Sequence, residues 1–403
     1  MSYHIPVKWN SVTLGELTAD TRPICYGVLK PGDYVENGVP LVRITDISGN
    51  YFDDGNLHLI SNELDQEFAR SKLKGGEILI SIQGTIGRVA ICPQKYAGAN
   101  ISRTIAVVEP DERAFKPFVY WFLRYYGQRE LFDAFGATRA SLNISTLRDL
   151  KIPLPPLAEQ KRIAAILDKA DAIRQKRKQA IDLADKFLRS VFLDMFGDPV
   201  TNPKGFPVKV LSQLYIDPKN GTKCGPFGSA LKKEEFVDEG IPVWNMDNIS
   251  LSGNFKDEPK LWVTEEKFNE IDAYSVIDGD VIISRAGTVG KMGVVRTKYS
   301  SSLISTNLIR VRFSEDLLPE YFVALMTYCK GRVGRLKTGP DGSFTHMNTG
   351  ILDKLEFPYP PVELQRKFLK LLADTEKYLD KMPPSQLNDL FNSLSQKAFS
   401  GQL

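Results

Sequence analysis

The stretch that decides the fold is GGEILISIQGTIGR (residues 75–88), because it occurs a second time as DGDVIISRAGTVGK (residues 278–291). Gly84 corresponds to Gly287, an offset of 203 positions (287 − 84) in a chain of 403 residues. Flanking segments recur in the same order, among them IPLPPL (152–157) and FPYPPV (357–362). A repeat of this length indicates a pair of whole domains, since solenoid repeats are about 20–50 residues long. Two similar domains in one chain imply two similar ligands, or one ligand with two similar halves.

Each copy has the pattern of a mixed α and β domain. Short apolar runs alternate with turn clusters rich in Gly, Asn and Asp, which indicates strands joined by turns. Core strands are predicted at residues 78–82, 89–92 and 105–108, and in the second copy at 281–283, 293–295 and 308–313. A packing helix is predicted to follow the strands of each copy, at residues 115–126 and 320–329.

A long helix is predicted after each proline-rich segment. Residues 157–196 contain no Pro or Gly and carry apolar or small residues every three or four positions. That spacing is typical of a coiled-coil seam, and 1.5 Å per residue gives a rod about 60 Å long. The counterpart begins at Val362, is interrupted by Pro383-Pro384 and resumes at Leu387, because proline removes a donor and clashes with the preceding turn.

We therefore expect an α+β fold in which two similar domains are separated by two long antiparallel helices. The helices are expected to form a coiled-coil spacer, and the whole chain is expected to have a pseudo-two-fold internal repeat. The predicted parts are a first domain at 1–150, a central helical region at 151–199, a second domain at 200–355 and a distal helical region at 356–403. The alternative is that each helix packs on its own domain or on a different subunit.

Composition is that of a soluble globular protein, with 42% apolar and 25% charged residues. The N-terminus lacks the pattern of a signal peptide, and no run reaches the roughly 18–20 apolar residues of a membrane span. The four cysteines show no CxxC spacing, which favours a reducing compartment over disulfides or structural zinc. We expect a cytoplasmic protein. The net charge of +3 permits nucleic-acid binding without arguing for it.

No motif of catalysis is recognisable in the sequence. The three histidines lie in unrelated contexts, and no HExxH, GxSxG or GxxxxGK[ST] motif occurs. Leu154, Tyr359 and Met382 precede the Pro-Pro pairs, so none forms the Asn- or Asp-Pro-Pro-aromatic loop of an amino-group DNA methyltransferase. We expect a chain without catalytic residues, without a metal and without a cofactor of its own.

The repeated turn, Ser-x-x-Gly-Thr-(Ile/Val)-Gly-(Arg/Lys), has two interpretations. As structure, it is a tight connection between strands whose glycines need positive φ. As function, its backbone N–H groups, its hydroxyl and its cation could bind a phosphate at the tip of the loop. The two interpretations are compatible.

Three segments carry a family resemblance: IPLPPLAEQKRI (152–163), LDMFGDP (193–199) and the terminal LFNSLSQKAFSGQL (390–403). Together with the repeated turn and GPFGS (225–229), they resemble the specificity subunit of type I restriction-modification systems, over the whole chain. Two departures are visible, Leu364 where the central copy has Glu159, and the Pro383-Pro384 break.

The resemblance implies a non-catalytic subunit with two target-recognition domains, each reading one half of a bipartite double-stranded DNA target. It implies helices that set the spacer and dock two methyltransferase subunits, which bind S-adenosylmethionine and methylate adenine. It also implies translocase–nuclease subunits in the complete restriction complex. The remaining alternative is a stand-alone two-domain DNA-binding regulator or scaffold.

Candidate DNA-binding residues are polar or basic loop positions, chosen mainly where the two copies differ, because Arg suits guanine and Asn or Gln suits adenine. In the first copy they are Arg43, Thr45, Asp46, Gln83, Thr85, Arg88, Arg103, Thr138 and Arg139. In the second they are Asn245, Asp247, Asn248, Arg285, Thr288, Lys291, Lys337 and Asp341. Arg88 and Lys291, basic in both copies, are predicted phosphate contacts.

Overall fold

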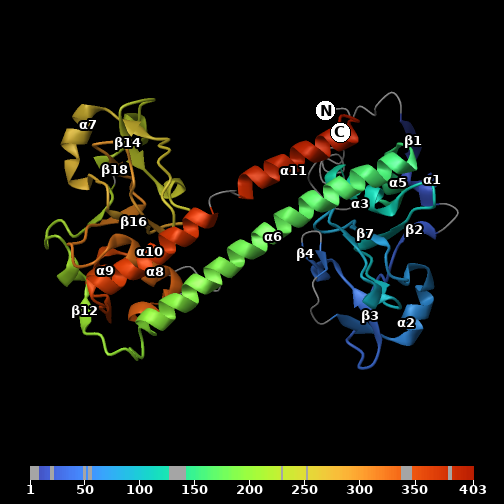
Figure 1. The fold of residues 1–403 in the computed structure, drawn as a ribbon, viewed down its shortest axis with the longest axis horizontal. Helices are drawn as coiled ribbons and strands as arrows, with labels where there is room; N and C mark the ends of the chain where they lie inside the picture. Colours follow the sequence, from blue (N-terminus) through green and yellow to red (C-terminus); the bar gives the residue numbers. More distant parts are fainter. Residues whose placement is uncertain are drawn as a thin grey trace. The chain divides into compact units, whose positions relative to one another are not determined.

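The computed structural model describes residues 9–18, 22–48, 51–52, 57–126, 142–227, 230–250, 253–336, 347–379 and 384–403. The chain forms two compact units (Figure 1). Unit 1 comprises Met1–Lys178 with Met382–Leu403, and unit 2 comprises Gln179–Lys381. Each unit therefore combines one copy of the repeat with helical segments, whereas the predicted boundaries separate domains from helices.

The centre of unit 1 is an antiparallel four-stranded sheet in the order β2-β10-β7-β8. Its strands are β2 (Arg22–Tyr26), β10 (Ile105–Glu109), β7 (Ile78–Ser81) and β8 (Val89–Ile91). A second sheet contains β6 (His58–Ile60), β3 (Val39–Val42) and β9 (Asn100–Ile101), with β3 parallel to β9. Two further pairs join β1 (Asn10–Thr13) to β11 (Lys151–Leu154) and β4 (Ile47–Ser48) to β5 (Tyr51–Phe52).

Unit 2 repeats this topology except for the β4–β5 pair, in whose place it has an isolated bridge between Ile249 and Phe255. Its antiparallel sheet has the order β13-β19-β16-β17, formed by β13 (Thr222–Cys224), β19 (Leu308–Val311), β16 (Val281–Ser284) and β17 (Met292–Val294). The second sheet contains β15 (Trp262–Val263), β14 (Ile241–Trp244) and β18 (Leu303–Ile304), again with one parallel pair. The pair β12 (Val208–Val210) and β20 (Glu356–Pro358) corresponds to β1 and β11. The internal duplication and the α+β class are therefore confirmed.

Helices accompany the sheets at corresponding places in both units. Unit 1 contains α1 (Leu14–Thr18), α2 (Asn62–Glu67), α3 (Lys116–Tyr126) and α5 (Ile144–Asp149). Unit 2 contains α7 (Glu265–Glu270), α8 (Pro319–Tyr328) and α9 (Thr349–Asp353). The hydroxyls of Ser61 and Thr264 cap α2 and α7 by accepting a main-chain N–H three residues on. The predicted core strands and both packing helices agree with these elements to within one or two residues.

One uninterrupted helix, α6 (Leu157–Phe196), spans 40 residues. It ends where Gly197 adopts φ +75° and donates its N–H to the Leu193 carbonyl at 2.8 Å, the conformation that glycine supplies at the end of many helices. The distal region forms two helices, α10 (Val362–Leu379) and α11 (Pro384–Phe399). The predicted interruption near Pro383-Pro384 falls between these two helices, where residues 380–383 lie outside the described ranges.

Each unit contains an antiparallel helix pair. In unit 1, Ile163 and Leu167 of α6 share a buried apolar cluster with Phe391 and Phe399 of α11. The Arg162 guanidinium donates to the Leu403 carbonyl at 2.8 Å, and Arg174 lies 4.5 Å from the ring centroid of Phe391, so the two helices run in opposite directions.

In unit 2, Phe192 and Phe196 of α6 pack against Phe368 of α10, with ring centroids 5.2 and 5.7 Å apart. The helices also pack on the domain of their own unit. In unit 1, the Trp121 indole of α3 donates to Asp168 of α6 at 2.8 Å. Pairing between helices and packing on the domain, which the sequence left as alternatives, therefore occur together.

A buried glutamine anchors the start of each long helix. Gln160 accepts the Phe115 N–H at 2.6 Å and donates to the carbonyls of Pro155 at 2.8 Å and Arg113 at 3.2 Å. Gln365 does the same in unit 2, with the Leu318 N–H at 3.0 Å and the carbonyls of Pro360 and Asp316 at 3.0 and 3.2 Å. This amide joins the proline-rich entry, the long helix and the segment that leads into the packing helix.

Candidate nucleic-acid interface

The repeated turn joins β7 to β8 and β16 to β17 with the same hydrogen bonds. The Ser81 hydroxyl donates to the Thr85 carbonyl at 2.5 Å and accepts the Arg88 N–H at 2.8 Å. In unit 2, Ser284 makes the corresponding bonds to Thr288 and Lys291 at 2.5 and 3.0 Å. A buried serine therefore closes each loop from the inside.

The glycines of the turn have the predicted backbone conformation. Gly84 and Gly87 have φ of +75° and +79°, and Gly287 and Gly290 have +65° and +79°, values that glycine adopts at no steric cost. The structural interpretation of the turn is confirmed. Thr85 and Thr288 are exposed at the two tips, and the phosphate interpretation stays a prediction for them.

The cations that both copies of the turn carry, Arg88 and Lys291, turn back toward the protein. Arg88 Nη1 donates to the Ile47 carbonyl at 2.9 Å, and Lys291 Nζ donates to the Met246 carbonyl at 2.8 Å. Both carbonyls belong to the segment after the central strand of the smaller sheet. Arg88 and Lys291 thus tie the turn to this segment, and only their remaining N–H groups are left for a phosphate.

That segment contains a short 3₁₀ turn whose last residue caps its own start. The Asp46 carboxylate accepts the Arg43 N–H at 2.8 Å, and Asn248 Oδ1 accepts the Asn245 N–H at 3.0 Å. Asn248 is buried and donates its amide to the carbonyls of Lys256 and Glu258 at 3.1 and 3.0 Å. Asp46 and Asn248 were expected to read bases, but the structure places both in internal hydrogen bonds.

The neighbours of these caps differ between units and reach the surface. Arg43 is half-buried and forms an ion pair with Asp46 at 3.4 Å, while Thr45 is exposed. In unit 2 the half-buried Asn245 accepts the N–H of the exposed Asp247 at 2.8 Å. The cap is therefore common to both units, and the side chains around it carry different chemistry.

The structure separates the remaining candidates. Gln83 is half-buried on the turn of unit 1, and Arg103 is exposed between β9 and β10. Arg285 is half-buried at the end of β16, where its guanidinium lies 4.3 Å from the ring centroid of Phe227. Four candidates lie outside the described residues: Thr138, Arg139, Lys337 and Asp341. Sequence reasoning did not propose Phe227 as a site residue, although GPFGS (225–229) was noticed as a family segment.

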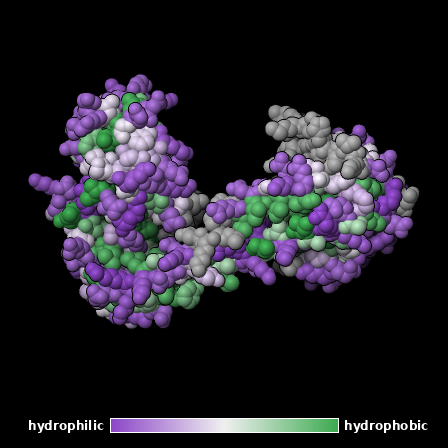
Figure 2. Space-filling view, turned by 45° about the horizontal axis from the view of Figure 1, so that its top comes forward, coloured by the Kyte–Doolittle hydropathy of each residue, from purple (hydrophilic) through white to green (hydrophobic). Residues whose placement is uncertain are grey.

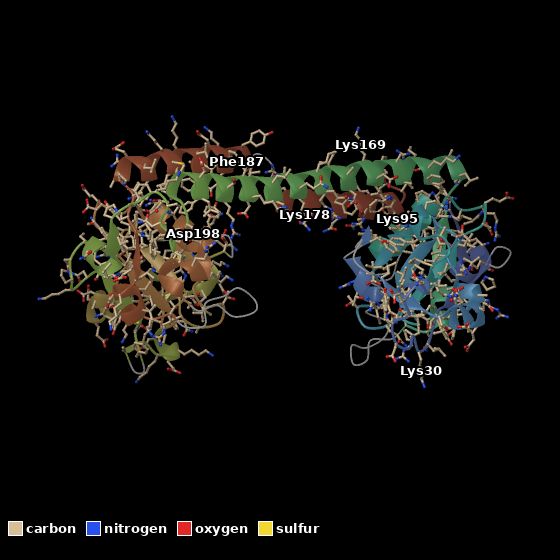
Figure 3. All side chains as sticks on the ribbon, turned by 90° about the horizontal axis from the view of Figure 1, so that it is seen from below. Lys30, Lys95, Lys169, Lys178, Phe187 and Asp198 are labelled. Carbon is tan, nitrogen blue, oxygen red and sulfur yellow. The ribbon has the colours of Figure 1, made fainter. Side chains whose placement is uncertain are left out.

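A second exposed surface lies on the helices. Leu183 and Phe187, four residues apart on α6, are 64% and 51% exposed, and Figure 3 shows Phe187 on α6. Ile173 of α6 and Leu390 of α11 are also exposed. Figure 2 shows hydrophobic side chains gathered over the helices of unit 1. Leu183 and Phe187 belong to unit 2, whereas Ile173 and Leu390 belong to unit 1. Exposed apolar patches are typical of surfaces that bind protein partners.

Within the described ranges, no three His, Cys, Asp or Glu side chains gather as ligands for a metal ion. Burial raises the pKa of the Cys92 thiol to about 12 and that of Cys329 to about 11, so both are poor nucleophiles near neutral pH. None of the described helices has the length and apolar character needed to cross a bilayer.

Comparison with known proteins places the chain in one family. The type I restriction modification DNA specificity domain matches residues 6–183 and 227–390. The putative type I restriction enzyme MjaX specificity subunit of Methanocaldococcus jannaschii is 26% identical over 395 residues, which cover 93% of this chain and 88% of the relative. The EcoBI specificity subunit of Escherichia coli is 30% identical over 204 residues, 49% of this chain and 43% of the relative.

A solved structure shares the fold. The crystal structure of the type I restriction-modification system S subunit from M. genitalium aligns with a TM-score of 0.55 at 18% identity and covers 99% of this chain and 98% of that chain. At this identity the likeness concerns the fold alone.

Proposed function

This chain belongs to the family of type I restriction-modification DNA specificity domains, and on that premise we propose that each unit reads one half of a bipartite DNA target. The observation that carries the proposal is the pairing of a common framework with different exposed chemistry. Both units hold the same turn by a buried serine and the same 3₁₀ turn by a buried cap. The side chains beside them are Arg43 and Thr45 in unit 1 but Asn245 and Asp247 in unit 2.

The division of labour within each unit follows from the chemistry of DNA recognition. Contacts to phosphates position a protein on DNA, and contacts to base edges provide sequence specificity. We assign the exposed Thr85 and Thr288, with the remaining N–H groups of Arg88 and Lys291, to phosphates. We assign Gln83, Arg103, Arg43, Asn245 and Arg285 to base edges, because they differ between the units and reach the surface.

This assignment is tested by mapping methylated adenines in cells that produce the chain with its methyltransferase subunits. The expected map has two half-sites separated by a constant gap. Arg103→Ala should relax the half-site of unit 1 only, and Asn245→Ala that of unit 2 only. A variant in one unit that relaxes both half-sites, or neither, would count against separate reading.

The exposed apolar side chains of the helices suit them to bind the methyltransferase subunits. We assign Leu183 and Phe187 to one docking surface, since partner interfaces have apolar cores with few charges. Two such subunits bind S-adenosylmethionine and methylate adenine in our proposal, this chain binds no cofactor, and translocase–nuclease subunits join the same assembly for restriction.

Co-purification tests the docking surface. Leu183→Asp with Phe187→Asp should abolish recovery of the methyltransferase subunit without changing the thermal unfolding of the chain. Lys178→Asp, a charge change at an exposed position of α6, is the matched control and should leave recovery unchanged. If the control variant lost as much recovery of the methyltransferase subunit as the double variant, the charge of the helix, and not the apolar surface, would decide binding.

The purified chain alone should neither methylate DNA nor bind S-adenosylmethionine, whereas addition of the methyltransferase subunits should restore both. Tight, sequence-selective DNA binding by the chain without partners, together with failure to bind a methyltransferase, would favour the stand-alone regulator.

A further inference from the structure

Phe227 occupies an unusual place for a large apolar side chain. It is 53% exposed and belongs to none of the apolar clusters formed by the described residues of unit 2. Its ring instead faces the guanidinium of Arg285, with Cζ 4.3 Å from the ring centroid. The ring therefore contacts a cation at the surface and does not contribute to the core.

The backbone fixes both partners of this contact. The Gly225 N–H donates to the Leu308 carbonyl at 2.8 Å, and a Cβ atom at Gly225 would lie only 2.0 Å from the Ser305 carbonyl oxygen. This close approach requires glycine and sets the position of Phe227 two residues on. The Arg285 N–H donates to the Asn307 carbonyl at 3.0 Å, so Gly225 and Arg285 flank the same end of β19 from the two strands beside it.

Unit 1 has a glycine at the corresponding position without this pair. A hypothetical Cβ at Gly27 would lie 1.8 Å from the Ile101 carbonyl oxygen, so the backbone also passes closely here, although against a different carbonyl. By strand register, Leu29 corresponds to Phe227 and Ile82 to Arg285. Leu29 is 46% exposed and Ile82 is buried. The cation and its aromatic support are therefore specific to unit 2, as expected of an element that distinguishes one half-site from the other.

We propose that Phe227 is a positioning residue that holds the Arg285 guanidinium in a fixed plane for bidentate contact with the N7 and O6 atoms of a guanine. The inference rests on the proposed function, in which unit 2 reads DNA. A guanidinium stacked on a ring keeps its N–H groups free at its edge, and those groups match the guanine acceptors. Fixing the plane before binding also lowers the conformational entropy lost when the complex forms.

The test uses the complete complex with its methyltransferase subunits and measures equilibrium binding to duplexes carrying every single base-pair change in both half-sites. Arg285→Ala should lower discrimination at one base pair of one half-site by about 5- to 150-fold, the range for loss of a bidentate pair. Phe227→Leu, which installs the residue of unit 1, should lower discrimination at the same base pair by about 2- to 5-fold, the range for an exposed cation–π contact.

Two further variants separate positioning from a purely structural effect. Phe227→Tyr keeps an aromatic face and should retain the discrimination of the natural chain. The double variant with Phe227→Leu and Arg285→Ala should discriminate no worse than Arg285→Ala alone, since the ring acts only through the guanidinium.

The outcomes are distinguishable. If Arg285→Ala relaxes one base pair while Phe227→Leu leaves that base pair unchanged or weakens all duplexes equally, the positioning role is wrong and the proposed function stands. If the natural complex shows no base preference in the half-site of unit 2, the proposed function itself fails. A purely structural role would give a different result. Phe227→Leu would then lose its cooperative unfolding transition while Phe227→Tyr kept it, and the Phe227→Leu protein that still folds would discriminate as well as the natural chain. That result would also overturn the positioning role.

Discussion

Replacing Gln160 by Ala should detach the start of α6 from the segment before α3. The amide accepts the Phe115 N–H at 2.6 Å and donates to the carbonyls of Pro155 and Arg113 at 2.8 and 3.2 Å. All three bonds are lost in the variant, and the side chain is nearly inaccessible to water, so solvent cannot replace them without local opening.

The size of the effect follows from the groups left unpaired. A buried donor without a partner costs about 1–3 kcal/mol, and a carbonyl costs less because its second lone pair is often satisfied elsewhere. We expect Gln160→Ala to lower the free energy of unfolding of unit 1 by about 2–4 kcal/mol. For a unit of this size the thermal midpoint should fall by about 5–15 °C.

Thermal unfolding combined with hydrogen exchange tests this prediction. Exchange should rise in residues 113–126 and 155–167, and unit 2 should keep the rates of the natural chain. Gln365→Ala should produce the mirror result in unit 2. The matched control is Gln179→Ala, an exposed glutamine on α6, whose effect should stay within about 0.5 kcal/mol. The reasoning would be refuted if Gln160→Ala lowered the free energy of unfolding no more than this control does. It would also be refuted if Gln160→Ala raised hydrogen exchange equally in both units.

Three other predictions concern different parts of the chain. Ser284→Ala removes both hydrogen bonds that close the second turn, so it should destabilise the turn by about 1–3 kcal/mol. Amide hydrogen exchange should become faster at residues 285–291, and unchanged exchange would show that the serine is dispensable. Four residues inserted at 175–179 lengthen α6 by about 6 Å and should widen the gap in the methylation map by about 2 base pairs at 3.4 Å each, with both half-sites kept. An unchanged gap would contradict the expectation that the helices set the spacer. Because burial raises the pKa of Cys92 to about 12 and of Cys329 to about 11, both thiols should resist alkylation at pH 8 and react faster as pH rises, measured by mass spectrometry; modification as rapid as in unfolded chain would be inconsistent with these shifts.

The repeated architecture could be predicted because its signals are local. Unbroken apolar runs such as residues 78–80 and 281–283 indicate buried strands whatever surrounds them. Residues 157–196 contain no Pro or Gly, and this absence was sufficient to predict the single long helix α6.

The site was harder to predict because its determinants are tertiary. Arg88 and Lys291 look like surface cations in the sequence, and only the fold shows that their side chains turn back to main-chain carbonyls. In the sequence Asn248 resembles an ordinary loop amide, yet its side-chain N–H groups donate to carbonyls 8 and 10 positions away. Gln160 and Gln365 did leave a signal, since each stands four residues after the second proline of a Pro-Pro pair.

Four side chains that hold the two units together share a chemical property. Ser81, Ser284, Gln160 and Gln365 all form hydrogen bonds to main-chain N–H and carbonyl groups. Because these hydrogen bonds are made to the backbone, they do not depend on the identity of the neighbouring side chains. Mutations that alter surface side chains therefore leave the framework intact as long as the backbone path is kept. Such a chain can acquire a new DNA preference in one half by a few substitutions, while the other half and its helical supports stay unaltered.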